Sequence, residues 1–269
     1  MSKKNEIKRI DVKSNDTSFV FKRKPIYECA KRFFDILLSF IFLAIFWWLI
    51  ILLAFIKWVE DFGGKSWQLV IKETPKGRYV SKKDGKRYKI YCKKDPNGEK
   101  DKTMYGAFYS SRRVGKNGRI FRFHKIRSMC PGAEKMKMKL IEMGFNEADE
   151  PAFKMKHDPR ITRVGRFLRR TSLDELPQIW DIFLGRLSIV GPRPPLVDEV
   201  AQYDDYQKHR LEVRGGLLCY WQITKNRNDL SFDEWVELDL KYIKERSAWT
   251  DLKIIFKAFW FVLFDRTGE

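Results

Sequence analysis

The longest uninterrupted hydrophobic stretch of the chain runs from Ile36 to Ile56, where 21 residues carry no charge and Ser39 is the only clearly polar side chain. A helix rises about 1.5 Å per residue, so this stretch matches the roughly 30 Å hydrocarbon core of a bilayer. The apolar part of a signal peptide is shorter, and no small-residue cleavage site follows before Lys57. The pattern predicts a membrane-inserted helix over residues 33–58.

A second apolar stretch, Trp249 to Asp265, is rich in Trp and Phe but contains Lys253 and Lys257. It is too short and too charged to span a bilayer comfortably, which favours an amphipathic helix over residues 249–269 that lies in the membrane interface. A C-terminal helix packed on the domain core would give a similar pattern. The two interpretations are compatible.

Short alternating segments mark residues 65–105 as a lysine-rich β-insertion. Asp84-Gly85 predicts a hairpin turn before the alternating segment Arg87–Cys92, and the sequence DPNG at residues 95–98 predicts another turn. The lysines are explained equally well by a solvated surface and by contact with anionic lipid headgroups.

The pattern of apolar and polar residues over 106–248 predicts an α/β domain that is mostly helical. Ser231 and Glu234 have the spacing of a capping box at the start of one helix. The pattern predicts a strand within 118–129 and helices near 131–143, 176–184, 195–211 and 231–245.

Charge changes this picture by indicating on which side of the membrane the flanks lie. The chain has a formal net charge of +19 and a pI near 9.7, which call for an anionic partner. Residues 1–34 hold ten Lys/Arg against four Asp/Glu, and residues 65–118 hold sixteen against five. Because positive flanks stay on the cytosolic side, we expect a re-entrant helix that returns both the basic segment 1–32 and the following domain to that side.

The four cysteines, at positions 29, 92, 130 and 219, include no C-x-x-C pair. Neither a zinc site nor a disulfide framework is expected from this spacing. Reduced thiols in a cytosolic domain are the plain interpretation.

The stretch RRTSLDELP, residues 169–177, is the strongest candidate for chemistry. Arginines at positions 160, 163, 166, 169 and 170 precede the adjacent carboxylates Asp174 and Glu175. Guanidinium groups match phosphate oxygens, and a carboxylate kept ionised beside them could attack phosphorus while its neighbour holds Mg²⁺. A basic helix face followed by a capping box of Ser172 and Glu175 is the alternative, and spacing alone does not decide between the two.

Two details of this stretch bear on its helices. Gly165 lies within the arginine row and favours a break in that helix. Pro177 lies too close behind Ser172 for an unbroken helix, so the next helix must start later or kink.

A second arginine lies in a stiff loop, GPRPP, that presents Arg193 between Pro192 and Pro194. Downstream, Arg214 adds a basic group, and Gly216 with its glycine neighbour lets the backbone come close to a ligand. The histidines lie far apart in the sequence and receive no role.

At this point the chain resembles the bacterial sugar transferase family, the monotopic polyprenyl-phosphate hexose-1-phosphate transferases. The resemblance rests on five segments that occur in order: KRFFD (31–35), GRIFRFHKIRSM (118–129), the long block 158–194, YWQI (220–223) and ELDLKYI (237–243).

The resemblance implies transfer of a hexose-1-phosphate from a UDP-sugar to undecaprenyl phosphate in the bacterial inner membrane, with release of UMP and the start of surface glycan assembly. Asp174 would be the nucleophile and, with Glu175, would bind Mg²⁺. Arg169, with Arg166 and Arg170 beside it, Arg193 and Arg214 would bind phosphate, and Pro192, Pro194 and Gly216 would shape the loops. The partners would be the two substrates and membrane phospholipid; nucleic acid is not expected, and a homo-oligomer is compatible with the sequence.

Two departures from the family pattern concern the membrane helix and one turn. Trp47-Trp48 stands where the family helix bends at Ser-Pro, and Arg214-Gly215-Gly216 stands where the family has Arg-Pro-Gly. The competing hypotheses are a membrane-anchored basic module that binds nucleic acid or anionic lipid, and an inactive scaffold in glycan assembly.

Overall fold

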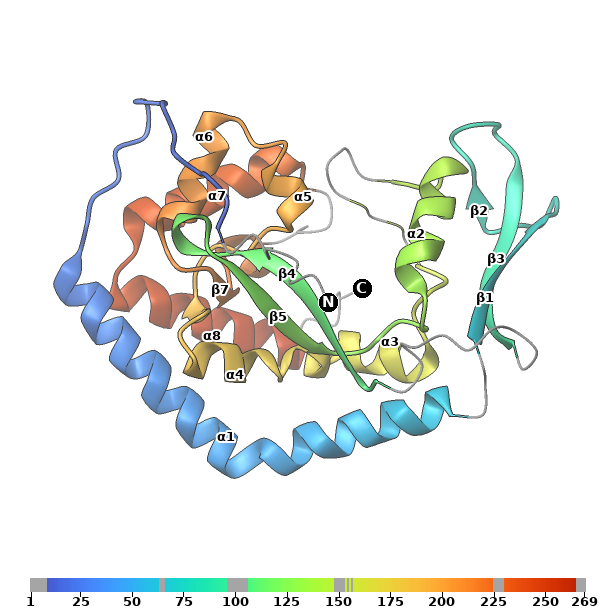
Figure 1. Cartoon of the computed structure of the whole chain (residues 1–269), viewed down its shortest axis with the longest axis horizontal. Coiled ribbons are helices and arrows are strands. Elements are labelled where there is room, and N and C mark those ends of the chain that lie inside the picture. Colours follow the sequence, from blue (N-terminus) through green and yellow to red (C-terminus); the bar gives the residue numbers. More distant parts are fainter. Residues whose placement is uncertain are drawn as a thin grey trace, which may run out of the picture. The chain divides into compact units, whose positions relative to one another are not determined.

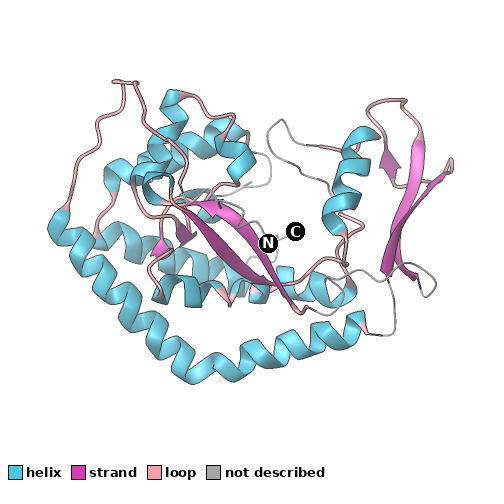
Figure 2. Cartoon of the chain, in the orientation of Figure 1, coloured by secondary structure: helices cyan, strands magenta, loops and turns pink. Residues whose placement is uncertain are grey.

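The computed structural model describes residues 9–62, 66–95, 106–147, 153, 155, 157–224 and 230–264. More of them lie in helices than in strands, as Figure 2 shows, in keeping with a mostly helical α/β fold. The helices are α1 (Pro25–Asp61), α2 (Ala133–Glu142), α3 (Arg163–Arg170), α4 (Gln178–Phe183), α5 (Val197–Val200), α6 (Asp205–Lys208), α7 (Phe232–Glu245) and α8 (Ala248–Phe264).

The strands form three small sheets with the orders β1-β3-β2, β4-β5 and β6-β7 (Figure 1). They are β1 (Ser66–Glu73), β2 (Tyr79–Val80), β3 (Arg87–Asp95), β4 (Phe108–Val114), β5 (Ile120–Ile126), β6 (Ser188–Val190) and β7 (Gly216–Leu218). The described residues also form the 3₁₀ turns η1 (Lys116–Gly118), η2 (Leu173–Glu175), η3 (His209–Glu212) and η4 (Tyr220–Ile223).

The chain divides into two compact units. The first comprises the residues up to Trp47, Ser110–His124 and the chain from Pro177 to Arg266. The second comprises Trp48–Tyr109 and Lys125–Leu176. Each unit is described by itself below.

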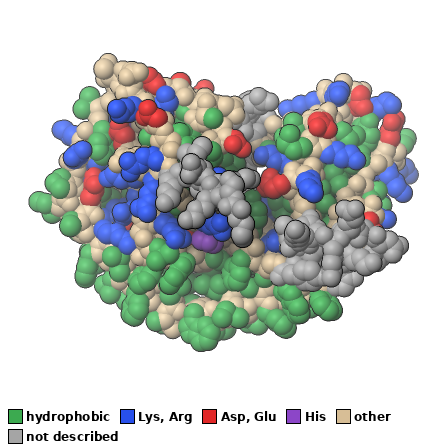
Figure 3. All heavy atoms as spheres, viewed as in Figure 1, with side chains coloured by type: hydrophobic (Ala, Val, Ile, Leu, Met, Phe, Trp, Pro, Cys, Tyr) green, Lys and Arg blue, Asp and Glu red, His purple; other side chains and the backbone are tan. Residues whose placement is uncertain are grey.

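Helix α1 extends beyond the apolar run at both ends. Its apolar side chains are largely exposed, including Trp47 at 58% and Trp48 at 51%. Figure 3 shows hydrophobic side chains gathered along the lower edge of the view, where α1 runs in Figure 1. Among the described helices, α1 is long and apolar enough to cross a membrane, so the predicted membrane helix has the expected length and composition.

The N-terminal half of α1 is attached to the first unit by polar side chains. The Arg32 guanidinium donates to the carbonyl oxygens of Ile182 and Phe183 at 2.7 and 2.9 Å. Asp35 is 2% exposed, and its Oδ1 accepts the backbone N–H of Ile189 at 3.0 Å. These contacts bind the start of the helix to the end of α4 and to β6.

The C-terminal half of α1 is attached to the second unit. Lys57 is fully buried and its Nζ lies 2.6 Å from Asp61 and 3.0 Å from Glu60. Glu60 also accepts the backbone N–H of Val164 at 2.8 Å, at the start of α3. The Lys57 ammonium is therefore paired within α1, and Glu60 bonds this end of the helix to α3.

The core of the first unit is formed by α7 and α8 with the parallel pair β6–β7. Val236, Leu240 and Ile243 are buried at helical spacing along α7. The predicted capping box is confirmed: Glu234 N–H donates to Ser231 Oγ, and Ser231 N–H donates to the Glu234 carboxylate at 2.7 Å.

Helix α8 is apolar on two faces. Ile254 and Ala258 are buried in the core, as expected for a packed C-terminal helix. The opposite face leaves large apolar side chains exposed, namely Trp249, Leu252, Phe256, Phe259 and Trp260. An exposed apolar face of this kind marks a contact surface.

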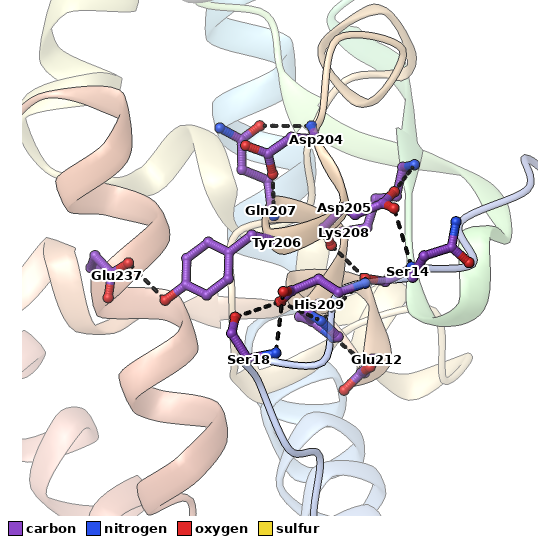
Figure 4. Close-up of polar contacts among 12 residues, drawn as sticks. Ser14, Ser18, Asp204, Asp205, Tyr206, Gln207, Lys208, His209, Glu212 and Glu237 are labelled. Atoms are coloured by element: carbon purple, nitrogen blue, oxygen red, sulfur yellow. Dashed lines mark hydrogen bonds and ion pairs between the residues drawn. The ribbon is translucent and has the colours of Figure 1, made fainter.

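The N-terminal segment packs on the first unit through His209 (Figure 4). The Phe19 ring is buried with its centroid 4.9 Å from that of His209. Ser14 Oγ and Asp16 Oδ2 lie 3.2 and 3.3 Å from His209 Nε2, and Glu212 contacts Nδ1 at 2.8 Å. Residues 1–8 of the predicted basic segment lie outside the described residues.

In the second unit, β1, β3 and β2 form an antiparallel sheet within the predicted β-insertion. The predicted turn at Asp84-Gly85 joins β2 to β3, and Gly85 adopts φ 69°, a conformation that favours glycine. Tyr88 and Ile90 are buried against Leu140 of α2, whereas Arg87 and Lys89 on the other face are exposed. The predicted DPNG turn extends beyond the described residues after Asp95.

The prediction of one helix near 195–211 was wrong. The segment contains α5, α6 and the turn η3. Asp204 ends the continuity because its side chain accepts the backbone N–H of Gln207 at 2.7 Å and caps a new helix. The helix predicted from 131 begins at Ala133, because Gly132 has φ 78°.

The buried ion pair between Arg210 and Asp239 provides a test of this core. The Arg210 and Asp239 side chains are 6% and 0% exposed, and Arg210 Nη2 lies 2.6 Å from Asp239 Oδ2. Asp239→Asn leaves the guanidinium without its countercharge, so we expect a loss of about 3–5 kcal/mol in the free energy of unfolding. Denaturant unfolding of the full chain in detergent, followed by Trp fluorescence, measures it.

The matched control is Glu237→Gln on the same helix, where the exposed side chain accepts from Tyr206. It should change stability by less than about 0.5 kcal/mol. Equal losses in the two variants would contradict the role given to the buried pair.

Candidate active site

The adjacent carboxylates Asp174 and Glu175 lie in the turn η2, between α3 and α4. Ser172 precedes them with φ 55° and makes no side-chain cap, so the capping-box alternative is wrong here. The Glu175 side chain instead pairs with Lys125 and does not reach back. As Pro177 predicted, the next helix starts later, at Gln178.

Apolar side chains on both sides of Asp174 and Glu175 hold this turn against a buried cluster of the second unit. Leu173 and Leu176 pack on a cluster formed by Leu53 of α1, Ile126 of β5 and Leu168 of α3. Asp174 is only 4% exposed, whereas the Glu175 side chain is 18% exposed. The turn therefore holds one carboxylate almost out of solvent and leaves its neighbour more accessible.

Lys125 on β5 supplies a cation to both carboxylates. Its Nζ lies 2.6 Å from Glu175 Oε1 and 3.9 Å from Asp174 Oδ2. A nearby ammonium favours the ionised form of a carboxylate, which is the form that can act as a nucleophile or metal ligand. Sequence reasoning missed this residue; the only available signal was its position in the basic strand of GRIFRFHKIRSM.

A close helix–loop contact positions Arg169. A Cβ added at Gly165 would lie 1.8 Å from the carbonyl oxygen of Ser128, so only glycine allows α3 to approach the loop after β5 this closely. Arg169 Nε then donates to Ser128 Oγ at 2.8 Å. The sequence had favoured a break at Gly165, but α3 continues through this residue. Thr162 caps the helix and accepts the Gly165 N–H at 3.1 Å.

The arginines at positions 160, 163, 166, 169 and 170 do not all lie on one helix. Arg163, Arg166, Arg169 and Arg170 are all exposed residues of α3. Arg160 precedes the helix and is 4% exposed, with its Nη2 2.6 Å from Asp158 and its guanidinium over the Phe153 ring. It is a structural residue of the loop.

In the first unit, the predicted loop residues meet next to the parallel pair β6–β7. Gly216 N–H donates to Pro192 O at 2.9 Å, and a Cβ at Gly215 would lie 2.6 Å from the Pro194 ring. A Cβ at Gly216 would lie 2.0 Å from the backbone nitrogen of Gly191. The two glycines therefore let the two loops pack tightly on each other.

Arg193 and Arg214 flank this packed pair of loops. Arg193 is half-buried between its prolines. Burial and the neighbouring Arg32 guanidinium lower the pKa of Arg214, although Asp35 and Glu28 oppose this. These residues belong to the first unit, and the acidic pair with Arg166, Arg169 and Arg170 belongs to the second.

A carboxylate–histidine pair in the first unit was also missed from sequence. His124 Nδ1 lies 2.9 Å from Asp181 Oδ1, and the His124 backbone N–H donates to Asp181 Oδ2 at 3.0 Å. Asp181 is fully buried, so the contact fixes the imidazole orientation. The partners are 57 residues apart, and no local pattern connects them.

Asp174 and Glu175 could hold a divalent cation. Among the described residues no group of three His, Cys, Asp or Glu side chains forms a metal cage. Two adjacent carboxylates nevertheless fit Mg²⁺, which commonly takes one or two carboxylates and completes its shell with water and substrate phosphates. A buried carboxylate with a lysine nearby, in the turn after an arginine-rich helix, is suited to phosphoryl chemistry.

Comparisons with known proteins place the second half of the chain in a defined group of sequences. A family model described as bacterial sugar transferase matches residues 100–265. The galactosyl transferase CpsE of Streptococcus agalactiae serotype III (strain NEM316) is 49% identical over 149 residues, which cover 55% of this chain and 33% of that protein.

Two further relatives carry informative names. The undecaprenyl-phosphate galactose phosphotransferase of Salmonella typhimurium is 41% identical over 154 residues, or 56% of this chain and 32% of that protein. The exopolysaccharide production protein ExoY of Rhizobium meliloti is 39% identical over 154 residues, or 56% of this chain and 68% of that protein. The matched part thus spans about a third of the first two relatives and about two thirds of ExoY.

Gly165→Ala tests the helix–loop contact. The added methyl group must push α3 away from Ser128, so we expect a loss of about 1–3 kcal/mol in the free energy of unfolding. Lys135→Ala, at an exposed position of α2, should change it by less than about 0.5 kcal/mol. Denaturant unfolding of both variants measures the difference, and a neutral Gly165→Ala would show that the contact is loose.

Proposed function

The chain belongs to the bacterial sugar transferase family, and on that premise we propose that it transfers a hexose-1-phosphate from a UDP-sugar to undecaprenyl phosphate, releasing UMP. The single observation that carries the proposal is the nearly buried Asp174, with Lys125 Nζ 3.9 Å away, in the turn that directly follows the arginine-rich helix α3. The names of the relatives, which include undecaprenyl phosphate, galactose and exopolysaccharide production, support this chemistry.

We assign Asp174 as the nucleophile. Its carboxylate oxygen attacks the phosphorus bonded to the sugar, and the bond from that phosphorus to the bridging oxygen breaks. UMP leaves with the bridging oxygen and its electron pair. The chain then carries the sugar phosphate on Asp174 as a mixed anhydride. This anhydride keeps the phosphoryl group reactive for the second step.

In the second step, a phosphate oxygen of undecaprenyl phosphate attacks the same phosphorus and the Asp174 carboxylate departs. The product is an undecaprenyl diphosphate sugar. Because the two substrates react in turn, the site need not hold both together, and ping-pong kinetics follow.

The surrounding side chains have distinct roles in this proposal. Lys125 contacts both carboxylates and supplies a positive charge beside them, and Arg169, oriented by Ser128, binds phosphate oxygens. Arg166 and Arg170 are the further phosphate-binding residues of the second unit, and Arg193 and Arg214 are those of the first. Glu175 and Asp174 would hold Mg²⁺, which neutralises phosphate charge when bound.

The membrane attachment follows from the contacts at the two ends of α1. Arg32 and Asp35 bond to α4 and β6, whereas Glu60 bonds to α3. Seven residues separate α3 from α4, too few to cross a membrane when folded into a turn. This short connection supports the proposal that both ends of α1 lie on one side of the bilayer, as in a re-entrant helix that lacks the Ser-Pro pair.

We place that side in the cytosol, with α1 in the bacterial inner membrane, because both flanks of the helix are basic. The exposed face of α8, which carries Trp249, Phe256 and Trp260, would lie in the same interface and contact phospholipid. A site at this level meets a soluble UDP-sugar and a lipid whose phosphate stays at the membrane surface.

Asp174→Asn tests the nucleophile. It should reduce UMP release from UDP-sugar and undecaprenyl phosphate by at least about 10³-fold, because the amide cannot form the anhydride. Mass spectrometry after rapid quenching should detect a sugar-phosphate adduct on Asp174 in the unmodified chain and none in the variant. Asp198→Asn, at an exposed acidic position, is the matched control and should keep full activity.

Competing hypotheses give different outcomes in this experiment. A basic binding module would show no turnover in the unmodified chain and no special effect of Asp174→Asn. An inactive scaffold would never form the adduct. Full turnover by Asp174→Asn would exclude the proposed nucleophile.

Thiol labelling of intact cells tests the topology. Cys29 is exposed before the apolar run of α1, and Lys83→Cys in a Cys29→Ser chain places an exposed thiol after the helix. A membrane-impermeant maleimide should label neither position in intact cells and both after permeabilisation. Labelling of one position but not the other in intact cells would mean that α1 spans the membrane.

A further inference from the structure

Three sulfur atoms from separate segments meet in the second unit. Cys92 lies on β3 of the inserted sheet, Cys130 in the loop after β5, and Met136 on α2. The Cys92 and Cys130 Sγ atoms are 3.4 Å apart, and Met136 Sδ lies 3.5 Å from the first and 3.6 Å from the second. We call these residues the sulfur triad.

Backbone contacts hold the triad in place. Cys130 N–H donates to Arg160 O at 2.8 Å, and Ala133 N–H donates to Cys130 O at 3.2 Å, so the cysteine leads directly into the helix that carries Met136. Cys92 is fixed by the pairing of β3 with β1, opposite Leu69. The sulfur positions are therefore set by strand pairing and a helix start.

The triad is shielded but reachable. Cys130 and Met136 are 2% and 8% exposed, whereas Cys92 is only half-buried. An ion could enter past Cys92 and would then be enclosed by sulfur on three sides.

The triangle has nearly the size of a metal site. Sides of 3.4, 3.5 and 3.6 Å place its centre about 2.0 Å from each sulfur, and metal–thiolate bonds are about 2.3 Å, so each sulfur needs to move outward by only a few tenths of an ångström. Thiolate and thioether ligands together select soft ions such as Cu(I).

We propose that the sulfur triad binds one soft monovalent metal ion, with Cu(I) as the best fit. Binding breaks the two S–H bonds, releases two protons and forms three metal–sulfur bonds, and no group is oxidised or reduced. The complex carries one net negative charge.

Neither a disulfide nor a zinc site explains the positions of all three sulfur atoms as well as a soft monovalent ion does. A disulfide between Cys92 and Cys130 leaves the equally close sulfur of Met136 without a role. Zinc would need a fourth ligand, and the described residues offer no group of three His, Cys, Asp or Glu side chains.

The site would tie the inserted sheet to the family domain. Cys92 precedes the family match at residues 100–265, whereas Cys130 and Met136 lie inside it. Cys130 is also two residues from Ser128, which positions Arg169. Metal occupancy would therefore stabilise the junction near the candidate active site, independently of the proposed transfer reaction.

The test uses the full chain in detergent under argon, with Cys29→Ser and Cys219→Ala as the background. Cu(I) is titrated in competition with the chromophoric chelator bathocuproine disulfonate. We expect one Cu(I) per chain, and X-ray absorption of the loaded protein should show a shell of sulfur ligands only. Cys92→Ser or Cys130→Ser should weaken binding by at least about 100-fold, because each removes a thiolate ligand.

Met136→Leu is the discriminating variant. It should weaken binding by about tenfold, because the thioether is the weaker ligand. Met138→Leu, at an exposed position of the same helix, is the matched control and should bind Cu(I) unchanged. Thermal unfolding without metal verifies that each variant folds, and Cu(I) should raise the Tm of the background chain but not of Cys130→Ser.

Three results would overturn the proposal. These are Cu(I) binding that is insensitive to Cys92→Ser and Cys130→Ser, equal effects of Met136→Leu and Met138→Leu, and Zn(II) binding as tight as that of Cu(I). A disulfide between Cys92 and Cys130 in the protein as purified, detected as a loss of two hydrogens by mass spectrometry, would assign the pair to a structural disulfide instead.

Discussion

The candidate site depends on the close approach of α3 to the backbone of Ser128. The missing side chain at Gly165 allows this approach, and a Cβ there would overlap the Ser128 carbonyl oxygen. The approach brings Arg169 to the Ser128 hydroxyl and leads the chain into the turn that carries Asp174 and Glu175. A shift of about 1 Å in this contact would move Arg169 relative to Asp174, the residues for which we propose phosphate binding and nucleophilic attack, and catalysis is sensitive to errors of that size.

The buried arginine–aspartate pairs of this protein differ from the contact between Lys125 and the acidic pair Asp174 and Glu175. Arg210–Asp239 and Arg160–Asp158 are buried pairs that each satisfy a guanidinium, and they give rigidity to the domain. At the acidic pair, Lys125 contacts Glu175 closely but Asp174 only at 3.9 Å. One lysine side chain therefore contacts two neighbouring carboxylates, unlike the buried pairs, in which each guanidinium faces one carboxylate.

The inserted sheet is attached to the domain rather than suspended in solvent. Tyr88 and Ile90 pack on Leu140, and the sulfur triad lies at the same junction. The sheet precedes the region that the family model matches, so its attachment is a feature of this chain beyond the family domain. Its exposed lysines remain available for either solvent or anionic lipid.

The sequence by itself determined the features that depend on neighbouring residues. Twenty-one uncharged residues specify a membrane helix, Ser231 and Glu234 specify a helix start, and Pro177 delays the start of α4. The contiguous block around Asp174 also identified the family and the acidic pair. Only the tertiary structure decided that Lys125 contacts this pair, that Ser128 bonds to Arg169, and that three distant sulfur atoms meet. Residue periodicity reports which face of an element is buried but not which element covers it, and the failed cap at Ser172 shows the consequence, since Glu175 bonds to a lysine 50 residues away.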